Sequence, residues 1–200
     1  HSIVNLVVLA GSRNGYGELS HLISCARRET VKGEYKSDRK MLEQNLSIDC
    51  IVIWVPNLLQ QPEQVACQAV WLQRVFPNQL WIGVQLLLRG DDRQKLAQLQ
   101  ALGEQFSIPL CAVGGVYMHH PMRRVLQDTI TAIRLGRQFD ELGFEAQSNG
   151  QRHLRNYEHL SKLYPPELIA QTMHISHRCN FVLDELRYEY PRELVPKEYT

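Results

Sequence analysis

The sequence has few cysteines, and their arrangement excludes two common uses of thiols. There are five in 200 residues, they are scattered, and none forms a CxxC pair. Disulfide frameworks use even sets of cysteines in short secreted chains, and structural zinc sites use clustered ligands. We therefore expect reduced thiols in a cytoplasmic protein, at Cys25, Cys50, Cys67, Cys111 and Cys179.

Long apolar runs and an excess of charge are also missing. No apolar run approaches the roughly 18 residues that a membrane-spanning helix needs, and no signal peptide is recognisable, so we expect no membrane partner. The formal net charge is +1, which argues against a strongly basic nucleic-acid-binding module. A hydrophobic content of 44% with 22% charged residues is that of an ordinary globular domain.

Two motif-like patterns lack the spacing that their chemistry needs. The stretch 11–15 is bounded by glycines but is neither GxGxxG nor GxxxxGK[ST], so it predicts a turn and not a phosphate loop. Ser12, His21 and Asp49 suggest a hydrolase triad, but no GxSxG elbow supports one. His21 falls on the polar side of a predicted helix, which indicates a surface histidine.

In the first 120 residues, short apolar segments alternate with helical patterns. Such alternation predicts an α/β fold whose strands are parallel and joined by right-handed crossovers. The near-continuous apolar character of the strands is typical of burial on both faces. The predicted strands are 3–10, 48–55, 80–88 and 108–113; the predicted helices are 16–29, a short one from Ser37, 63–75 and one that begins near 89–92.

The pattern changes after residue 120. Helices are predicted at 122–135, 150–163 and 166–179, with no strand between them. This divides the chain into a β/α unit (1–120), a helical annex (121–180) and an extended acidic-aromatic segment (181–200). Because a core-like strand begins just after His1 and the final segment has the character of a domain junction, we expect a piece of a longer protein.

Several blocks, taken in order, are similar to the PHP (polymerase and histidinol phosphatase) domain of bacterial C-family DNA polymerases, and most to their error-prone branch. They extend over essentially the whole chain: 15–23 with 26–28 and 32–35, then 49–56, 126–136, 152–155 and 183–191. The resemblance implies the later part of a distorted β/α barrel of parallel strands in 1–120. It also implies that an N-terminal HxH strand precedes the chain.

The same resemblance implies a function for the parent protein. It would be an error-prone, DNA-directed DNA polymerase, a nucleotidyltransferase of DNA repair and replication, with magnesium held by palm residues beyond Thr200. This piece would be a scaffold with no catalytic residue and no cofactor of its own, and 181–200 would be a linker to the palm. Its partners would be the rest of the polymerase chain, DNA and dNTPs through other domains, and repair-polymerase accessory proteins.

The resemblance also marks positions where metal ligands are missing. Error-prone members usually have Asp where Gly115 stands and His where Tyr117 stands, and often an acidic residue at Gln85. Glycine has no side chain, and a neutral phenol is a poor metal ligand. We therefore expect no metal here. His119 is the residual candidate, but it and His120 would point to opposite faces of an extended segment.

Four arginines, Arg123, Arg124, Arg134 and Arg137, are candidates for contacts with DNA or with another domain. The alternative for them is a solvated or salt-bridged helix face, which the near-zero net charge favours.

Two other functions stay open. The domain could be a metal-dependent phosphoesterase or exonuclease in its own right, or a metal-free protein-interaction module. A partial barrel would also expose unpaired strand edges, which predicts self-association of this piece.

Overall fold

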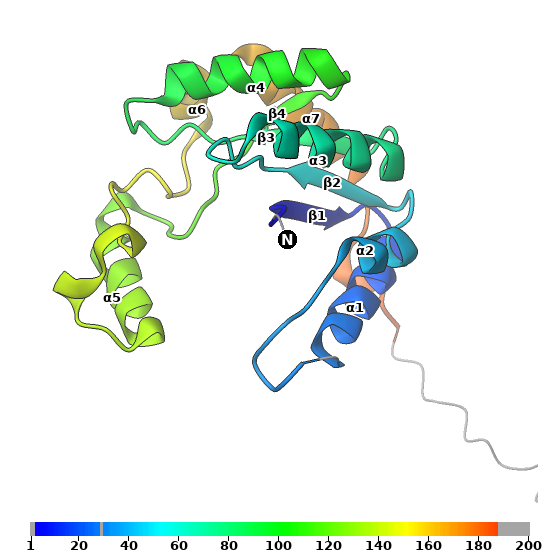
Figure 1. Cartoon of the computed structure of the whole chain (residues 1–200), viewed down its shortest axis with the longest axis horizontal. Helices are drawn as coiled ribbons and strands as arrows, with labels where there is room; N and C mark the ends of the chain where they lie inside the picture. Colours follow the sequence, from blue (N-terminus) through cyan, green and yellow to red (C-terminus); the bar gives the residue numbers. More distant parts are fainter. Residues whose placement is uncertain (1–2, 29, 188–200) are drawn as a thin grey trace, which may run out of the picture.

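The computed structural model describes residues 3–28 and 30–187, and its centre is a four-stranded sheet in the order β1-β2-β3-β4 (Figure 1). β2 pairs with β3, and β3 with β4, in parallel, as predicted, whereas β1 is antiparallel to β2. The strands are β1 Leu6–Ala10, β2 Cys50–Trp54, β3 Leu80–Val84 and β4 Leu110–Ala112. The fold is therefore α/β with a mostly parallel sheet.

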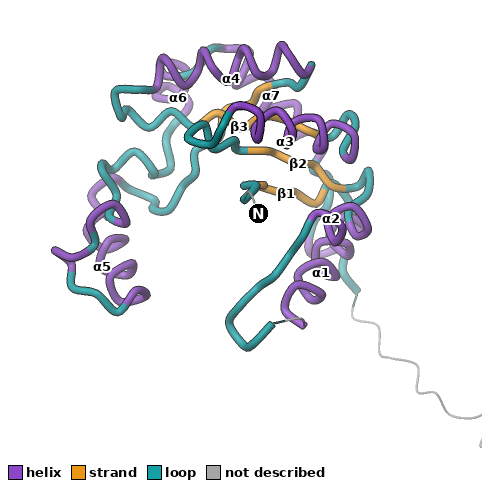
Figure 2. The backbone as a smooth tube through the Cα atoms, in the orientation of Figure 1, coloured by secondary structure: helices purple, strands orange, loops and turns teal. Residues whose placement is uncertain are grey.

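Helices separate these strands along the chain and follow the last of them. The α-helices are α1 Arg13–Arg28, α2 Arg39–Asn45, α3 Pro62–Val75, α4 Asp92–Phe106, α5 Arg124–Leu135, α6 Tyr157–Leu163 and α7 Pro166–Arg178. Within the described ranges there are also four short 3-10 turns: η1 Pro121–Arg123, η2 Phe139–Glu141, η3 Gly143–Glu145 and η4 Leu183–Glu185. Figure 2 shows α5 apart from the sheet, joined to it by two loop segments.

The sheet is buried on both faces, because every residue of β2 and β3 is buried. Successive side chains of a strand point to opposite faces. Val52 and Ile82 accordingly lie in the larger core cluster, which includes residues of α3 and α4. Ile53 and Trp81 lie in a second cluster, where Ile175 of α7 joins them. The helices α3 and α4 thus cover one face of the sheet and α7 the other.

The prediction that all strands are parallel is wrong for β1. After β1, the chain continues through α1 and α2, and these two helices pack against each other. The chain thereby returns to the end of the sheet that it left, where the amide of Gly11 donates to the carbonyl of Asp49 at 2.8 Å. A single crossover helix would carry the chain to the opposite end of the sheet. Because α1 and α2 together do not, β2 runs antiparallel to β1.

The helix predicted for 150–163 is shorter in the structure and begins at Tyr157. Asn156 is the reason, because its side chain accepts a hydrogen bond from the amide of His159 and caps the helix. Before it, His153 forms an isolated parallel bridge with Met118. Residues 152–154 therefore pair with residues 117–118 beyond the end of β4.

Three other expectations can be compared with the described residues. All five cysteines are free thiols. Within 3–28 and 30–187, no helix is both long and apolar enough to cross a membrane. Of the predicted segment 181–200, the part before residue 188 contains the turn η4, and the remainder lies outside the described residues.

Replacing Ile175 by Ala tests whether α7 is an integral layer of the core. Ile175 is 4% exposed against the sheet, so we expect the substitution to lower the free energy of unfolding by about 3 kcal/mol. The control is Met173→Ala on the same helix, where the side chain is 52% exposed and the loss should be about 0.5 kcal/mol or less. Urea denaturation measures both, and equal losses would show that α7 does not cover the sheet.

Candidate functional site

The candidate site lies where β3 and β4 end side by side. Because these strands are parallel, their carboxyl ends meet at one edge of the sheet, and the residues that follow them lie close together. Gln85 follows β3, and Gly115 and Tyr117 follow β4. Arg152 reaches the same place from the segment before α6. We call Gln85, Gly115, Tyr117 and Arg152 the sheet mouth.

Gly115 has a left-handed backbone and lies against the ends of two side chains, which would have to shift to admit a side chain here. Its φ of +53° is in the left-handed region that favours glycine. A Cβ atom at this position would lie 2.6 Å from Nη1 of Arg152 and 2.8 Å from Nε2 of Gln85. Both distances are shorter than real Cβ contacts, so an aspartate cannot be placed here without moving Arg152 and Gln85.

Arg152 holds the segment after β4 by three contacts. Its Nη1 donates to the carbonyl of Gly115 at 3.0 Å, and its guanidinium carbon lies 4.9 Å from the centre of the Tyr117 ring. Its own carbonyl accepts from the amide of Tyr117 at 2.9 Å. Burial lowers the pKa of Arg152; the nearby positive charge of Arg89 lowers it further, and Tyr117 opposes the shift.

A second arginine fixes the neighbouring loops. Arg155 donates from Nη1 to the carbonyl of Leu86 at 2.9 Å and from Nη2 to the hydroxyl of Tyr164 at 3.3 Å. The Tyr164 hydroxyl in turn donates to the carbonyl of Val113 at 3.1 Å and accepts from the amide of Leu86 at 3.0 Å. Arg155 and the buried Tyr164 thus join the segments that leave β3 and β4.

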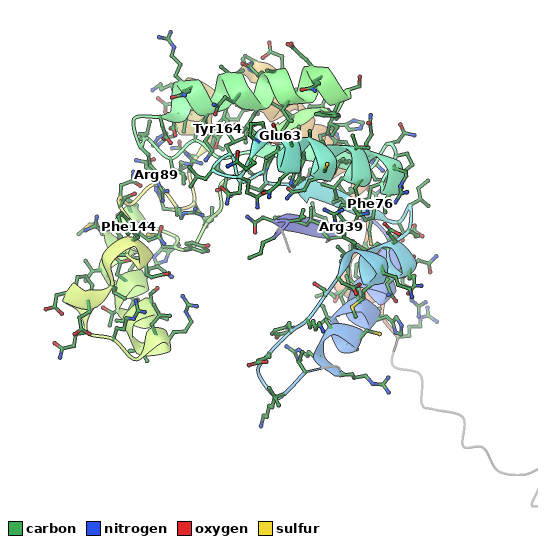
Figure 3. All side chains as sticks on the ribbon, in the orientation of Figure 1. Arg39, Glu63, Phe76, Arg89, Phe144 and Tyr164 are labelled. Atoms are coloured by element: carbon green, nitrogen blue, oxygen red, sulfur yellow. The ribbon has the colours of Figure 1, made fainter. Side chains whose placement is uncertain are left out.

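Sequence reasoning placed Arg152 and Arg155 only in the block 152–155 that carries the family resemblance, and it missed these roles. The signal that could have found them is Asn156, a good helix cap that marks the preceding residues as non-helical. Figure 3 shows Tyr164 and Arg89 on the sheet side of the molecule, whereas Phe144 lies with α5.

The residues at the sheet mouth do not fit a metal ion. Gln85 is a neutral amide, and the side chain of His119 is exposed. His120 caps η1, with Nδ1 accepting from the amide of Met122 at 3.3 Å. Among the described residues, no group of three or more His, Cys, Asp or Glu side chains could hold a metal. The structure brings Gln85 and Gly115 together, but it does not assemble a ligand set around them.

The structure also offers no activated nucleophile at the positions that the sequence suggested. The hydroxyl of Ser12 donates to Asp49 at 2.8 Å and accepts from the amide of Gly15 at 3.2 Å. His21 is exposed, and its nearest polar contact is the sulfur of Cys25 at 3.5 Å. Ser12 and Asp49 therefore stabilise the start of α1, and His21 is not part of this pair.

Two buried thiols are equally unsuited to nucleophilic chemistry. Burial raises the pKa of Cys111 to about 12. Burial, together with a hydrogen bond to Glu18, also raises the pKa of Cys50 to about 12. Because only the thiolate is nucleophilic, both side chains are inert at neutral pH.

The four candidate contact arginines lie on or beside α5. Arg124 pairs with Asp128 at 3.8 Å and also donates to the carbonyl of Ser148. Arg123, Arg134 and Arg137 are exposed. The face of α5 turned towards the protein is partly polar and includes the buried Asp128. Apolar side chains are exposed elsewhere on and around the helix, at Met122, Val125, Leu126, Ile130, Ile133, Phe139 and Phe144.

Nearly the whole chain is similar to one segment of larger proteins named error-prone DNA polymerase. It is 50% identical over 195 residues to the one from Methylococcus capsulatus, which is 98% of this chain and 18% of that protein. For Dechloromonas aromatica the identity is 46% over 98% of this chain and 19% of the protein. For Pseudomonas aeruginosa it is 44% over 96% of this chain and 18% of the protein.

The chain therefore spans less than a fifth of the length of the curated relatives that it matches. The predicted resemblance to error-prone polymerases is confirmed by these identities over nearly the whole chain. No protein-family model matches the chain. The assignment to a PHP domain stays a prediction.

Replacing Gly115 by Ala tests the close packing at the sheet mouth. We expect a loss of about 2–3 kcal/mol of unfolding free energy, from the left-handed backbone and from the contact with Arg152. Gly143→Ala is the control, because Gly143 has nearly the same φ, +51°, with open space around it. It should lose only about 1 kcal/mol. If urea denaturation shows the same loss of unfolding free energy for both variants, the contact with Arg152 adds nothing to the cost of a side chain at position 115.

Proposed function

We propose that this chain is a segment of an error-prone, DNA-directed DNA polymerase, which performs damage-tolerant synthesis by template-directed nucleotidyl transfer. The observation that supports this most is the 41–50% identity over 96–98% of the chain to segments of proteins with that name. The substrates would be primed DNA and dNTPs, bound by parts of the protein outside this chain. Magnesium would be held there as well.

Within that protein the segment would be a scaffold, part of a PHP-type barrel whose remaining strands lie outside it. The geometry supports a structural role, because the polar groups at the ends of β3 and β4 bond to one another. Arg152 binds the Gly115 carbonyl, and Arg155 with Tyr164 binds Leu86 and Val113. These contacts leave no activated acid, base or nucleophile at the sheet mouth. A PHP domain whose metal site has degenerated would have this property.

The exposed side of α5 would be covered by the rest of the same polypeptide. Met122 is 81% exposed and Ile133 is 75% exposed, whereas Asp128 is 2% exposed. An amphipathic helix normally buries its apolar side, so this arrangement requires another surface against α5. More than four-fifths of the length of the relatives lies outside this chain and can supply it.

Primer extension with the full-length polypeptide tests the proposed activity. With magnesium and a primed template we expect template-dependent incorporation of dNTPs, and none after chelation of the metal. An unprimed template is the control. Failure to extend the primer with any divalent metal would refute the polymerase assignment.

Hydroxyl-radical footprinting tests what covers α5. We expect Met122 and Phe144 to be oxidised in the isolated 200-residue chain and protected in the full-length polypeptide without DNA, because another part of the protein excludes water from them. The buried Met118 is the internal control and should be protected in both. Protection that appears only when primed DNA is added would assign α5 to DNA, and no protection in either case would show a solvated face.

A further inference from the structure

The sheet mouth gathers electron-rich groups that suit an organic cation better than a metal ion. The carbonyl oxygen of Gly115 and the face of the Tyr117 ring both turn towards the guanidinium of Arg152. A planar guanidinium can donate hydrogen bonds to a carbonyl oxygen and stack on an aromatic face at the same time. Transition metals instead need imidazole, thiolate or carboxylate ligands, which Gly115, Tyr117 and Gln85 do not provide.

Arg152 and a metal ligand at position 115 exclude each other in this geometry. A Cβ atom on Gly115 would lie 2.6 Å from Nη1 of Arg152, so a carboxylate could not be built there while the guanidinium stays in place. The absence of a side chain at position 115 is thus what allows Arg152 to approach the backbone. The conformation of Arg152 therefore depends on the residue at position 115 being glycine.

Arg152 connects two segments that are distant in sequence through both its backbone and its side chain. The amides of Tyr117 and Met118 donate to the carbonyl of Arg152 at 2.9 and 3.2 Å, and the amide of Leu154 donates to the carbonyl of Met118 at 3.1 Å. The side chain of Arg152 adds a hydrogen bond to Gly115 and a stacking contact to Tyr117. The backbone and the guanidinium of Arg152 together therefore hold the segment after β4 against the segment before α6.

We infer that the guanidinium of Arg152 is a built-in cation that takes the place of a metal ion at the sheet mouth and fixes the 114–118 segment without any divalent metal. Arginine suits this role because its side chain stays protonated at physiological pH. This cation is covalently part of the chain, so a chelator cannot remove it, whereas a chelator could remove a bound metal. Arg152 is accordingly a positioning residue.

Hydrogen exchange measured by mass spectrometry on the full-length polypeptide tests this inference at the amides of Tyr117 and Met118. Arg152→Met keeps a long side chain without charge, and we expect it to speed exchange at these amides about tenfold. Arg152→Lys keeps the charge and should exchange more slowly than Arg152→Met. The matched control is Arg93→Met, at an exposed position of α4, which should leave these amides unchanged.

Chemical rescue separates a cation site from ordinary packing. In Arg152→Ala, low-millimolar methylguanidinium should restore slow exchange at Tyr117 and Met118, whereas zinc or manganese should not. In the unchanged protein, a chelator should have no effect on these amides. Equal exchange in Arg152→Lys and Arg152→Met would overturn the inference, as would rescue by a divalent metal or a response of the unchanged protein to the chelator.

None of these measurements needs polymerase activity. The inference about Arg152 therefore stands or fails independently of primer extension.

Discussion

The burial of β2 and β3 on both faces is the constraint on which the rest of the structure depends. Apolar strands of this kind are stable only while helices exclude water from both sides of the sheet. The helices α3 and α4 cover one face, and α7 supplies the second layer only after β4. The chain must therefore pass the end of the sheet again before α7 begins, and this return carries Arg152 and Arg155 to the sheet mouth.

The same return satisfies backbone groups that the sheet leaves unpaired. Beyond the last ladder bonds, the carbonyls of Leu86, Val113 and Gly115 have no strand neighbour among the described residues. Buried carbonyls without a donor are costly, so each needs a partner. Arg155, Tyr164 and Arg152 provide these donors. The hydrogen bonds around the sheet mouth thus arise because carbonyls beyond the strand ends need donors. This explains why Arg152 and Arg155 bond to neutral oxygens.

Much of the fold follows from local patterns, and the errors have identifiable physical causes. The three parallel strands β2, β3 and β4 with α3 and α4 were predictable because an apolar strand followed by an amphipathic helix has one favourable way to pack. The direction of β1 was not, since it depends on how α1 and α2 pack together. That the residues at positions 115 and 85 carry no charge can be read directly from the sequence. The approach of Arg152 depends on a contact across 37 residues, which no local pattern contains.

The helix α5 is held by polar contacts on one side and exposes apolar side chains on the other. Its buried Asp128 bonds to the amide of Gln147 at 2.9 Å and pairs with Arg124, so the inward face is held by polar contacts that fix the helix without an apolar core. That pairing also neutralises one of the four candidate arginines. A helix built to bind phosphates would present its cations on a polar face, whereas here Ile130 and Ile133 are exposed beside Arg134. Burying such a mixed surface gains most from a protein partner, in which apolar contacts and charge complementarity act together.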